Sequence, residues 1–197
     1  MIEEIYNRRS IRKYLDTPIS NDDIIDIIKS AMKAPSSKNR QPWKYIVIQG
    51  DAKAEMIKAF ERGILREETK EALLPMSKKH IPAAKYTIEI IKQTPVVIFV
   101  VNSLQKGMLE NLEPEERVYN ICNIQSISAS VQNMLLSATE KGIGSLWVCD
   151  IFFAYKELCD WLNEDGDLIC AVALGYPDED PKERPRKKFD DVVEWRN

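Results

Sequence analysis

The chain has 197 residues, a formal net charge of −3, and 44% hydrophobic against 30% charged residues. These values are typical of one globular domain and exclude a disordered or fibrous chain. No apolar run approaches the roughly 20 residues of a membrane-spanning helix, and the negative charge gives no general attraction to nucleic acid.

The N-terminus begins with an amphipathic pattern and lacks the apolar core of a signal peptide, which predicts a cytoplasmic protein. The four cysteines are far apart in the sequence and form no C-x-x-C pair, and His80 is the only histidine. We therefore expect neither a disulfide framework nor a metal site.

The first strong helical pattern follows Ser20, an N-cap residue with Asp23 three positions later. Apolar residues at helical spacing continue to about Ala34, and Pro35 is expected to end the helix. A strand over 44–49 and a helix over 52–62 follow.

The segment 63–93 is helical in pattern but charged, and two prolines interrupt it. We expect it to be mobile and to cover a pocket as a lid. The β-branched run 96–101 predicts a central strand that is buried on both faces. The polar segment 103–116 is a second candidate lid.

The longest predicted helix spans 117–141, and Gly142 is expected to end it. Small and large apolar residues surround much of its circumference. Small residues permit close backbone approach, so this helix is expected to lie either at the domain centre or at a dimer interface.

Two further strands, 145–148 and 168–174, flank a short helix, and a charged tail with apolar anchors follows. Such a tail often lies across a partner subunit. Strands interleaved with helices indicate an α+β or α/β sandwich in a single domain over 1–197.

Two basic clusters lie at opposite ends of the chain, one around Arg8 to Lys13 and the other around Arg184 to Lys188. Taken alone, each cluster is better explained by a solvated surface, so a phosphate site needs independent support. The sequence lacks the glycine-rich dinucleotide and P-loop motifs and the G-x-S-x-G elbow, so those sites are not expected.

Three motifs occur in a fixed order: Arg8-Arg9-Ser10-Ile11-Arg12, the loop from Pro35 to Trp43, and Pro185-Arg186-Lys187-Lys188. In these three motifs, in the long helix and in the Gly-Ile-Gly-Ser sequence that follows it, the chain resembles the FMN-dependent nitroreductase superfamily. The resemblance implies an α+β fold, a three-layer α/β/α sandwich with a central, mostly antiparallel sheet, in an intertwined homodimer. It also implies an enzyme that holds FMN between subunits and passes hydride from NADH or NADPH to a small acceptor such as a nitroaromatic or a quinone.

The resemblance assigns the phosphate of FMN to Arg8 and Arg186, whose guanidinium groups suit paired, charge-assisted hydrogen bonds. Arg9, Ser10 and Lys188 are expected to support them. Arg12 is expected near the pyrimidine edge of the flavin, where a fixed cation favours the reduced state.

Donors and acceptors for the flavin carbonyls and ribityl hydroxyls are expected from Ser36, Ser37, Asn39 and Gln41 of the second subunit. At flavin N5 we expect a backbone N–H near Cys149 and Asp150, with the Cys149 thiol as an optional extra donor.

The sequence leaves alternative functions open. The protein could hold flavin as a sensor or storage module, or it could be a specialised member such as a reductive dehalogenase or an enone reductase. The basic clusters could instead bind an acidic protein. No residue selects the acceptor, and none distinguishes NADH from NADPH or from another electron donor.

Overall fold

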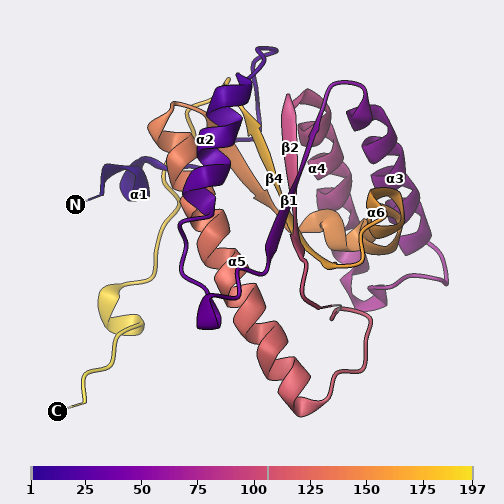
Figure 1. Cartoon of the computed structure of the whole chain (residues 1–197). Helices are drawn as coiled ribbons and strands as arrows, with labels where there is room; N and C mark the ends of the chain where they lie inside the picture. Colours follow the sequence, from indigo (N-terminus) through magenta and orange to yellow (C-terminus); the bar gives the residue numbers. More distant parts are fainter. Residues whose placement is uncertain (1, 106, 197) are drawn as a thin grey trace.

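The structure is a computed structural model, which describes residues 2–105 and 107–196; Lys106, within the second candidate lid, lies outside the described residues. Helices cover both faces of one sheet (Figure 1). The helices are α1 (Glu3–Asn7), α2 (Asn21–Ala31), α3 (Ala52–Glu67), α4 (Ile81–Gln93), α5 (Pro114–Glu140) and α6 (Tyr155–Leu162), and the short 3₁₀ helices are η1 (Ser37–Asn39), η2 (Pro75–His80), η3 (Asp150–Ala154) and η4 (Phe189–Asp191).

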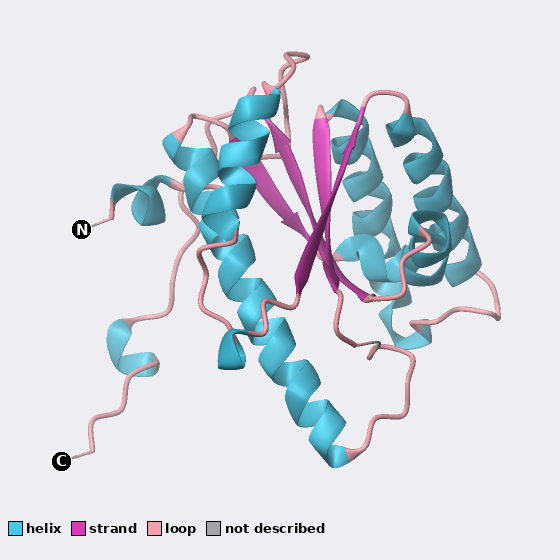
Figure 2. Cartoon of the chain, viewed as in Figure 1, coloured by secondary structure: helices cyan, strands magenta, loops and turns pink. Residues whose placement is uncertain are grey.

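The sheet has four strands in the order β1-β2-β4-β3, and every neighbouring pair is antiparallel. The strands are β1 (Trp43–Gln49), β2 (Val96–Asn102), β3 (Gly144–Val148) and β4 (Asp167–Gly175). All seven residues of β2 are buried, which confirms the predicted central strand. Figure 2 shows these strands between the two helical layers.

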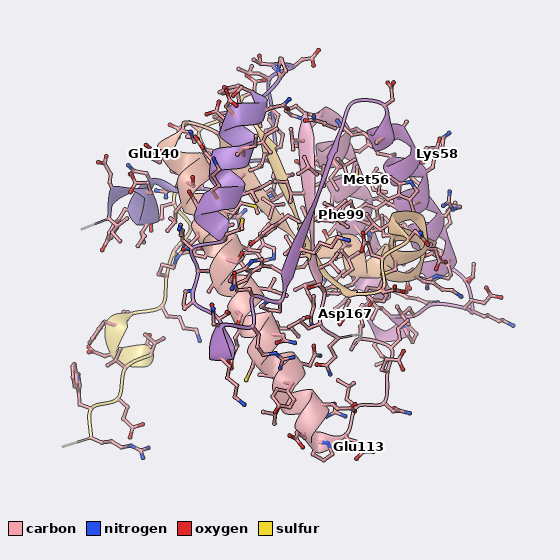
Figure 3. All side chains as sticks on the ribbon, viewed as in Figure 1. Met56, Lys58, Phe99, Glu113, Glu140 and Asp167 are labelled. Carbon is pink, nitrogen blue, oxygen red and sulfur yellow. The ribbon has the colours of Figure 1, made fainter. Side chains whose placement is uncertain are left out.

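Each face of the sheet carries its own hydrophobic core because side chains alternate along every strand. On one face Ile98 and Val100 pack with residues of α2 and α5. On the other face Phe99 packs among residues of α3, α4 and α6, and its ring lies 6.3 Å from that of Trp161. Figure 3 shows Phe99 and Met56 directed into this second layer. The expected three-layer sandwich is confirmed.

Local signals set the ends of the main helices as expected. The Ser20 hydroxyl accepts the Asp23 N–H at 3.1 Å and caps α2. At the C-terminal end of α5, Gly142 has a positive φ of 69°, and the next N–H, that of Ile143, donates to the Ala138 carbonyl at 2.8 Å. This closing pattern satisfies the last carbonyls of the helix.

Three boundaries differ from the sequence expectation. Helix α3 continues through Gly63 to Glu67, α2 ends at Ala31 rather than Ala34, and α5 begins at Pro114 behind a capping box of Glu113 and Glu116. The last of these shortens the second candidate lid, since its final residues belong to α5.

The segment expected to be a mobile lid, 63–93, is largely regular. Its second half is α4, which buries Ala84, Ile88 and Ile91 in the core. A part of the first half, residues 68–80, consists of turns and η2. The lid therefore stays a prediction for this shorter piece only.

The ends of the chain lie against each other beside β3. Ile11 donates its N–H to the Ser145 carbonyl at 3.0 Å, Leu15 donates to Tyr176 at 2.9 Å, and Asp178 donates to Lys13 at 3.0 Å. Along the described residues, no helix is long and apolar enough to cross a membrane. The cytoplasmic location expected from the sequence stays a prediction.

Candidate functional site

The pairing of the two chain ends places the two basic clusters around one pocket. The pocket has a volume of about 250 Å³. Six cationic side chains line it, three from each end of the chain: Arg8, Arg9, Arg12, Lys182, Arg184 and Arg186. Residues far apart in the sequence thus form a single positively charged site, and Ser10 lies among them.

The charges in this pocket repel one another. The pKa of Arg8 lies below its usual value because the side chain is partly buried and because Arg186 and Arg9 are close to it. Glu183 lies 3.9 Å from Arg9, but both groups are partly exposed to solvent, so this ion pair is weak. A bound anion would relieve the repulsion, and a phosphate dianion suits guanidinium donors.

The backbone around this pocket is held in place by several contacts. The Arg12 N–H donates to the Glu179 carboxylate, and the Arg12 guanidinium donates to the Ser10 carbonyl at 3.1 Å. The Tyr14 hydroxyl donates to the Ile11 carbonyl at 2.7 Å, within the core. These bonds hold the backbone at Ile11 and Arg12, and the bond to Ser10 holds the Arg12 guanidinium.

A second pocket of about 170 Å³ adjoins the first and shares Arg9 and Pro181 with it. Its floor is the start of β3, where Gly144 leaves room for Ile11; a Cβ at Gly144 would lie 2.9 Å from that side chain. The Ser145 hydroxyl is buried here and has no hydrogen-bond partner among the described residues. A buried polar atom without a partner is costly, and it marks a place for a polar ligand group.

The loop from Ser36 to Gln41 has a specific conformation. Lys38, Asn39 and Gln41 all adopt positive φ values, of 52°, 54° and 47°. The Gln41 N–H donates to the Ser36 hydroxyl at 3.0 Å, and the Ser37 N–H donates to Ser126 of α5 at 3.2 Å. These contacts turn the exposed Ser37, Asn39 and Gln41 away from the core.

This loop lies far from the cationic pocket of the same chain. It packs beside Ser126 in the middle of α5, whereas Thr139 at the end of α5 lines the neighbouring pocket. At about 1.5 Å per residue, the two points are separated by about 20 Å along the helix axis. The labelled residues Glu113 and Glu140 mark the ends of this helix in Figure 3, and α1 lies near the second end in Figure 1.

Cys149 and Asp150 follow β3, as expected. Cys149 is exposed as a residue, but its sulfur is partly shielded from water, and this desolvation together with the nearby Asp150 raises the pKa of the thiol. The Asp150 carboxylate accepts a hydrogen bond of 2.5 Å from the Thr87 hydroxyl of α4. The Asp150 side chain is thus engaged within the fold.

The structure brings five of the twelve expected residues together in the cationic pocket, namely Arg8, Arg9, Ser10, Arg12 and Arg186, and adds others. Lys182 and Arg184 line the pocket but were not among the expected ligands, although both belong to the basic tail that pointed to the site. Lys188 is exposed and does not line the pocket. Within one chain, the residues of the 36–41 loop lie away from the cationic pocket. The expected contact of this loop with FMN therefore has to be made in the other subunit.

Solved structures share this fold. A provisionally named nitroreductase of Desulfovibrio desulfuricans, solved with FMN, matches with a TM-score of 0.72 and 25% identity over 99% of this chain and 96% of its own. An FMN-dependent nitroreductase of Mycobacterium smegmatis, solved with NADPH, matches with a TM-score of 0.75 and 17% identity over 99% and 97% of the two chains. The fold is that of the nitroreductases.

Sequence comparison assigns the family. The model of the nitroreductase family matches residues 5–176. A provisionally named NADH dehydrogenase/NAD(P)H nitroreductase of Archaeoglobus fulgidus is 29% identical over 91% of this chain and 86% of its own, and a provisionally named NAD(P)H nitroreductase of Haemophilus influenzae is 26% identical over 98% and 94%. The chain belongs to the nitroreductase family of oxidoreductases.

Proposed function

We propose that this protein is a homodimeric oxidoreductase that binds FMN and uses NADH or NADPH to reduce a small acceptor such as a nitroaromatic or a quinone. The observation that carries the proposal is the convergence of Arg8 and Arg186, from opposite ends of the chain, on one pocket. The relatives named for NAD(P)H and the related structure solved with FMN support the choice of cofactor and donor.

The residues of the pocket fit the phosphate end of FMN. Guanidinium groups hold phosphate through two parallel hydrogen bonds each, and the mutual repulsion of Arg8 and Arg186 favours a bound dianion between them. Arg9, Ser10, Lys182 and Arg184 line the same wall. In this proposal they add charge and shorter donors around the phosphate.

The remaining contacts, those with the flavin ring, are assigned to residues near the two ends of β3. Arg12 supplies a fixed positive charge toward the flavin ring, and the backbone that joins Cys149 to Asp150 supplies an N–H donor at its far end. When bound, FMN supplies the hydride chemistry, and water can supply protons. The fold therefore needs no histidine or carboxylate as a general acid.

The second subunit completes the site. The loop exposes Ser37, Asn39 and Gln41 to solvent, whereas Ser36 is half-buried. The loop lies about 20 Å along α5 from the pocket of its own chain. A second copy packed on α5 would bring its loop to this pocket. We infer that each FMN contacts the arginines of one subunit and the loop of the other.

The test begins with the purified protein. We expect a yellow preparation whose released flavin co-chromatographs with FMN, since the pocket is suited to a single terminal phosphate. Oxidation of NADH or NADPH is then followed with menadione or a nitrofuran as acceptor. Bound FMN without acceptor-dependent turnover would refute the enzymatic assignment, and a colourless protein that takes up no FMN would refute the site itself.

A further inference from the structure

Two of the free cysteines come together at the end of the β3–β4 pair. The last pair in the register of these strands joins Val148 to Ala171. In an antiparallel pair the next residue of one strand faces the preceding residue of the other, so Cys149 comes opposite Cys170. Strand β3 ends at Val148, and Cys149 is the first residue after it, with φ −100° and ψ −13°.

The two cysteines also share a face of the sheet. Val148 and Ala171 belong to the core on the side of α3, α4 and α6, and their neighbours therefore face the other layer. Cys170 is a member of the core on the side of α2 and α5. Cys149 is exposed at the rim of that side, beside the buried Cys170.

The spacing suits a covalent link. Opposite residues of an antiparallel pair have Cα atoms about 4.5–5.5 Å apart, and a disulfide requires about 4.4–6.8 Å. The two sulfur atoms also affect each other: the pKa of Cys170 is raised first by burial and then by the nearby Cys149.

We propose that Cys149 and Cys170 form a reversible disulfide when the protein meets a peroxide. The Cys149 sulfur takes one oxygen from hydrogen peroxide, the O–O bond breaks, and one water leaves. The Cys170 sulfur then attacks the Cys149 sulfur, the S–O bond breaks, and the oxygen leaves as a second water. Two thiols lose two electrons in total, and the peroxide gains them.

Cys149 is the thiol that reacts first because it is the exposed member of the pair. Partial desolvation of its sulfur and the nearby Asp150 raise its pKa, so little of it is thiolate at neutral pH. The rate of oxidation therefore rises with pH. Reduction by a small dithiol restores both thiols.

The link would fix the backbone from Cys149 to Asp150, which the proposed function places beside the flavin. Only that consequence depends on the proposed function. The disulfide itself is detected by chemical mapping in either the flavin-bound or the flavin-free protein, so failure of one proposal is distinguishable from failure of the other.

The experiment treats the folded protein with hydrogen peroxide, blocks free thiols under denaturing conditions, and maps tryptic peptides without reduction. Cleavage after Lys141 and Lys156 places Cys149 in the peptide 142–156, and Cys122 falls in 118–141. Cys159 and Cys170 share the peptide 157–182. The mapping is therefore run in a Cys159→Ser background, in which only Cys170 remains in that peptide.

We expect the peptides 142–156 and 157–182 to be joined, and the number of free thiols in the wild-type chain to fall from four to two. The joined species disappears in Cys149→Ser and in Cys170→Ala, persists in Cys122→Ser, and is removed by dithiothreitol. Cys149→Ser alters an exposed residue, so this variant tests the proposal even if Cys170→Ala folds poorly. A link from Cys149 to Cys122, links only between chains, or stepwise oxidation of Cys149 while Cys170 stays free would overturn it.

Discussion

At the scale of single residues, the cationic pocket is a balance between repulsion in the free protein and attraction to a ligand. The pKa of Arg8 lies below its usual value through burial and through the like charges of Arg186 and Arg9. The same closeness that costs free energy in the empty pocket gives several donors for one phosphate. Binding and stability should therefore respond in opposite directions when one of these charges is removed.

We predict that Arg186→Ala weakens FMN binding by about 10- to 100-fold, since a charge-assisted hydrogen bond contributes about 1.5–3 kcal/mol. The unfolding temperature of the flavin-free protein should not fall, because a like-charge repulsion with Arg8 is removed. Fluorescence titration and thermal unfolding measure the two effects.

Riboflavin and a neighbouring lysine supply the controls for this prediction. Affinity for riboflavin, which lacks the phosphate, should change little in Arg186→Ala. Lys187→Ala should bind FMN like the wild type, because Lys187 does not line the pocket. Equal losses of FMN and riboflavin affinity in Arg186→Ala would show that this arginine does not serve the phosphate.

A second residue-scale prediction concerns Tyr45, whose hydroxyl is hydrogen-bonded to Ser130 of α5. Burial raises the pKa of Tyr45 to about 12, and the bond to Ser130 opposes the rise only in part. The unfolded value is about 10. Because the folded protein holds this proton more tightly, its contribution to stability is complete below about pH 10 and is lost as the pH rises toward about 12.

In Tyr45→Phe this titration is absent. We expect the variant to lose about 0.5–1.5 kcal/mol of unfolding free energy at neutral pH, since Ser130 loses its partner. Between about pH 10 and about pH 12, however, it should lose less stability than the wild type. Denaturant unfolding at each pH measures this difference, and parallel pH profiles for the two proteins would contradict the prediction.

At the scale of elements, a fully buried carboxylate holds the turn that follows α3. Glu67 accepts the backbone N–H groups of Leu73 at 2.8 Å and Leu74 at 2.9 Å, and it also pairs with Arg66. The Arg66 guanidinium reaches Glu157 of α6 as well, at 2.7 Å. This network ties residues 68–74 to the core, which limits the mobility of the shortened lid.

We predict that Glu67→Gln destabilises the protein by about 1–3 kcal/mol. The two N–H groups bind different carboxylate oxygens, the amide NH2 that replaces one of them cannot accept a hydrogen bond, and the charge is lost. Hydrogen exchange should accelerate mainly in residues 68–80. The matched control is Glu68→Gln, whose exposed ion pair with Lys85 is expected to contribute less than about 1 kcal/mol. Unchanged exchange in residues 68–80 of Glu67→Gln would contradict this role.

At the scale of the whole molecule, exposed apolar residues of α5 favour a dimer. Its inner face is buried in this chain, but Val118 is 59% exposed and Ile121 is 50% exposed. The tail is also apolar at its surface, with Trp195 77% exposed. Apolar side chains grouped on one side of a molecule favour association with a second copy.

We predict that Ile121→Asp yields a monomer at concentrations at which the wild type is a dimer, and that the monomer retains little FMN although Arg8 and Arg186 are intact. Light scattering gives the mass, absorbance gives the flavin content, and circular dichroism checks the fold. Leu65→Asp, at an equally exposed position on α3 in the other layer, should stay dimeric. A dimeric, flavin-bound Ile121→Asp would exclude this face of α5 from the interface.

Several features followed from local signals in the amino-acid order. Ser20 caps α2, Gly142 ends α5 with a positive φ, and the β-branched run of β2 forms the buried central strand. Each depends on groups within a few residues of one another, or on burial of an entire strand, so the linear pattern was sufficient. The arginine clusters and the 36–41 loop were likewise recognised from the order of the motifs.

Other features depended on contacts between distant segments. Gly63 interrupts the helical pattern, yet α3 continues through it. A Cβ there would lie 2.3 Å from the Ala154 Cα of η3, so the glycine serves close packing and does not end the helix. Similarly, the sequence of α4 is too charged to indicate a core helix, and its role in the core follows only from the packing of its apolar face against the sheet. Lys182 and Arg184 join the pocket only because residues 13 and 178 are hydrogen-bonded across the two chain ends. Such choices follow from long-range packing, which no local pattern encodes.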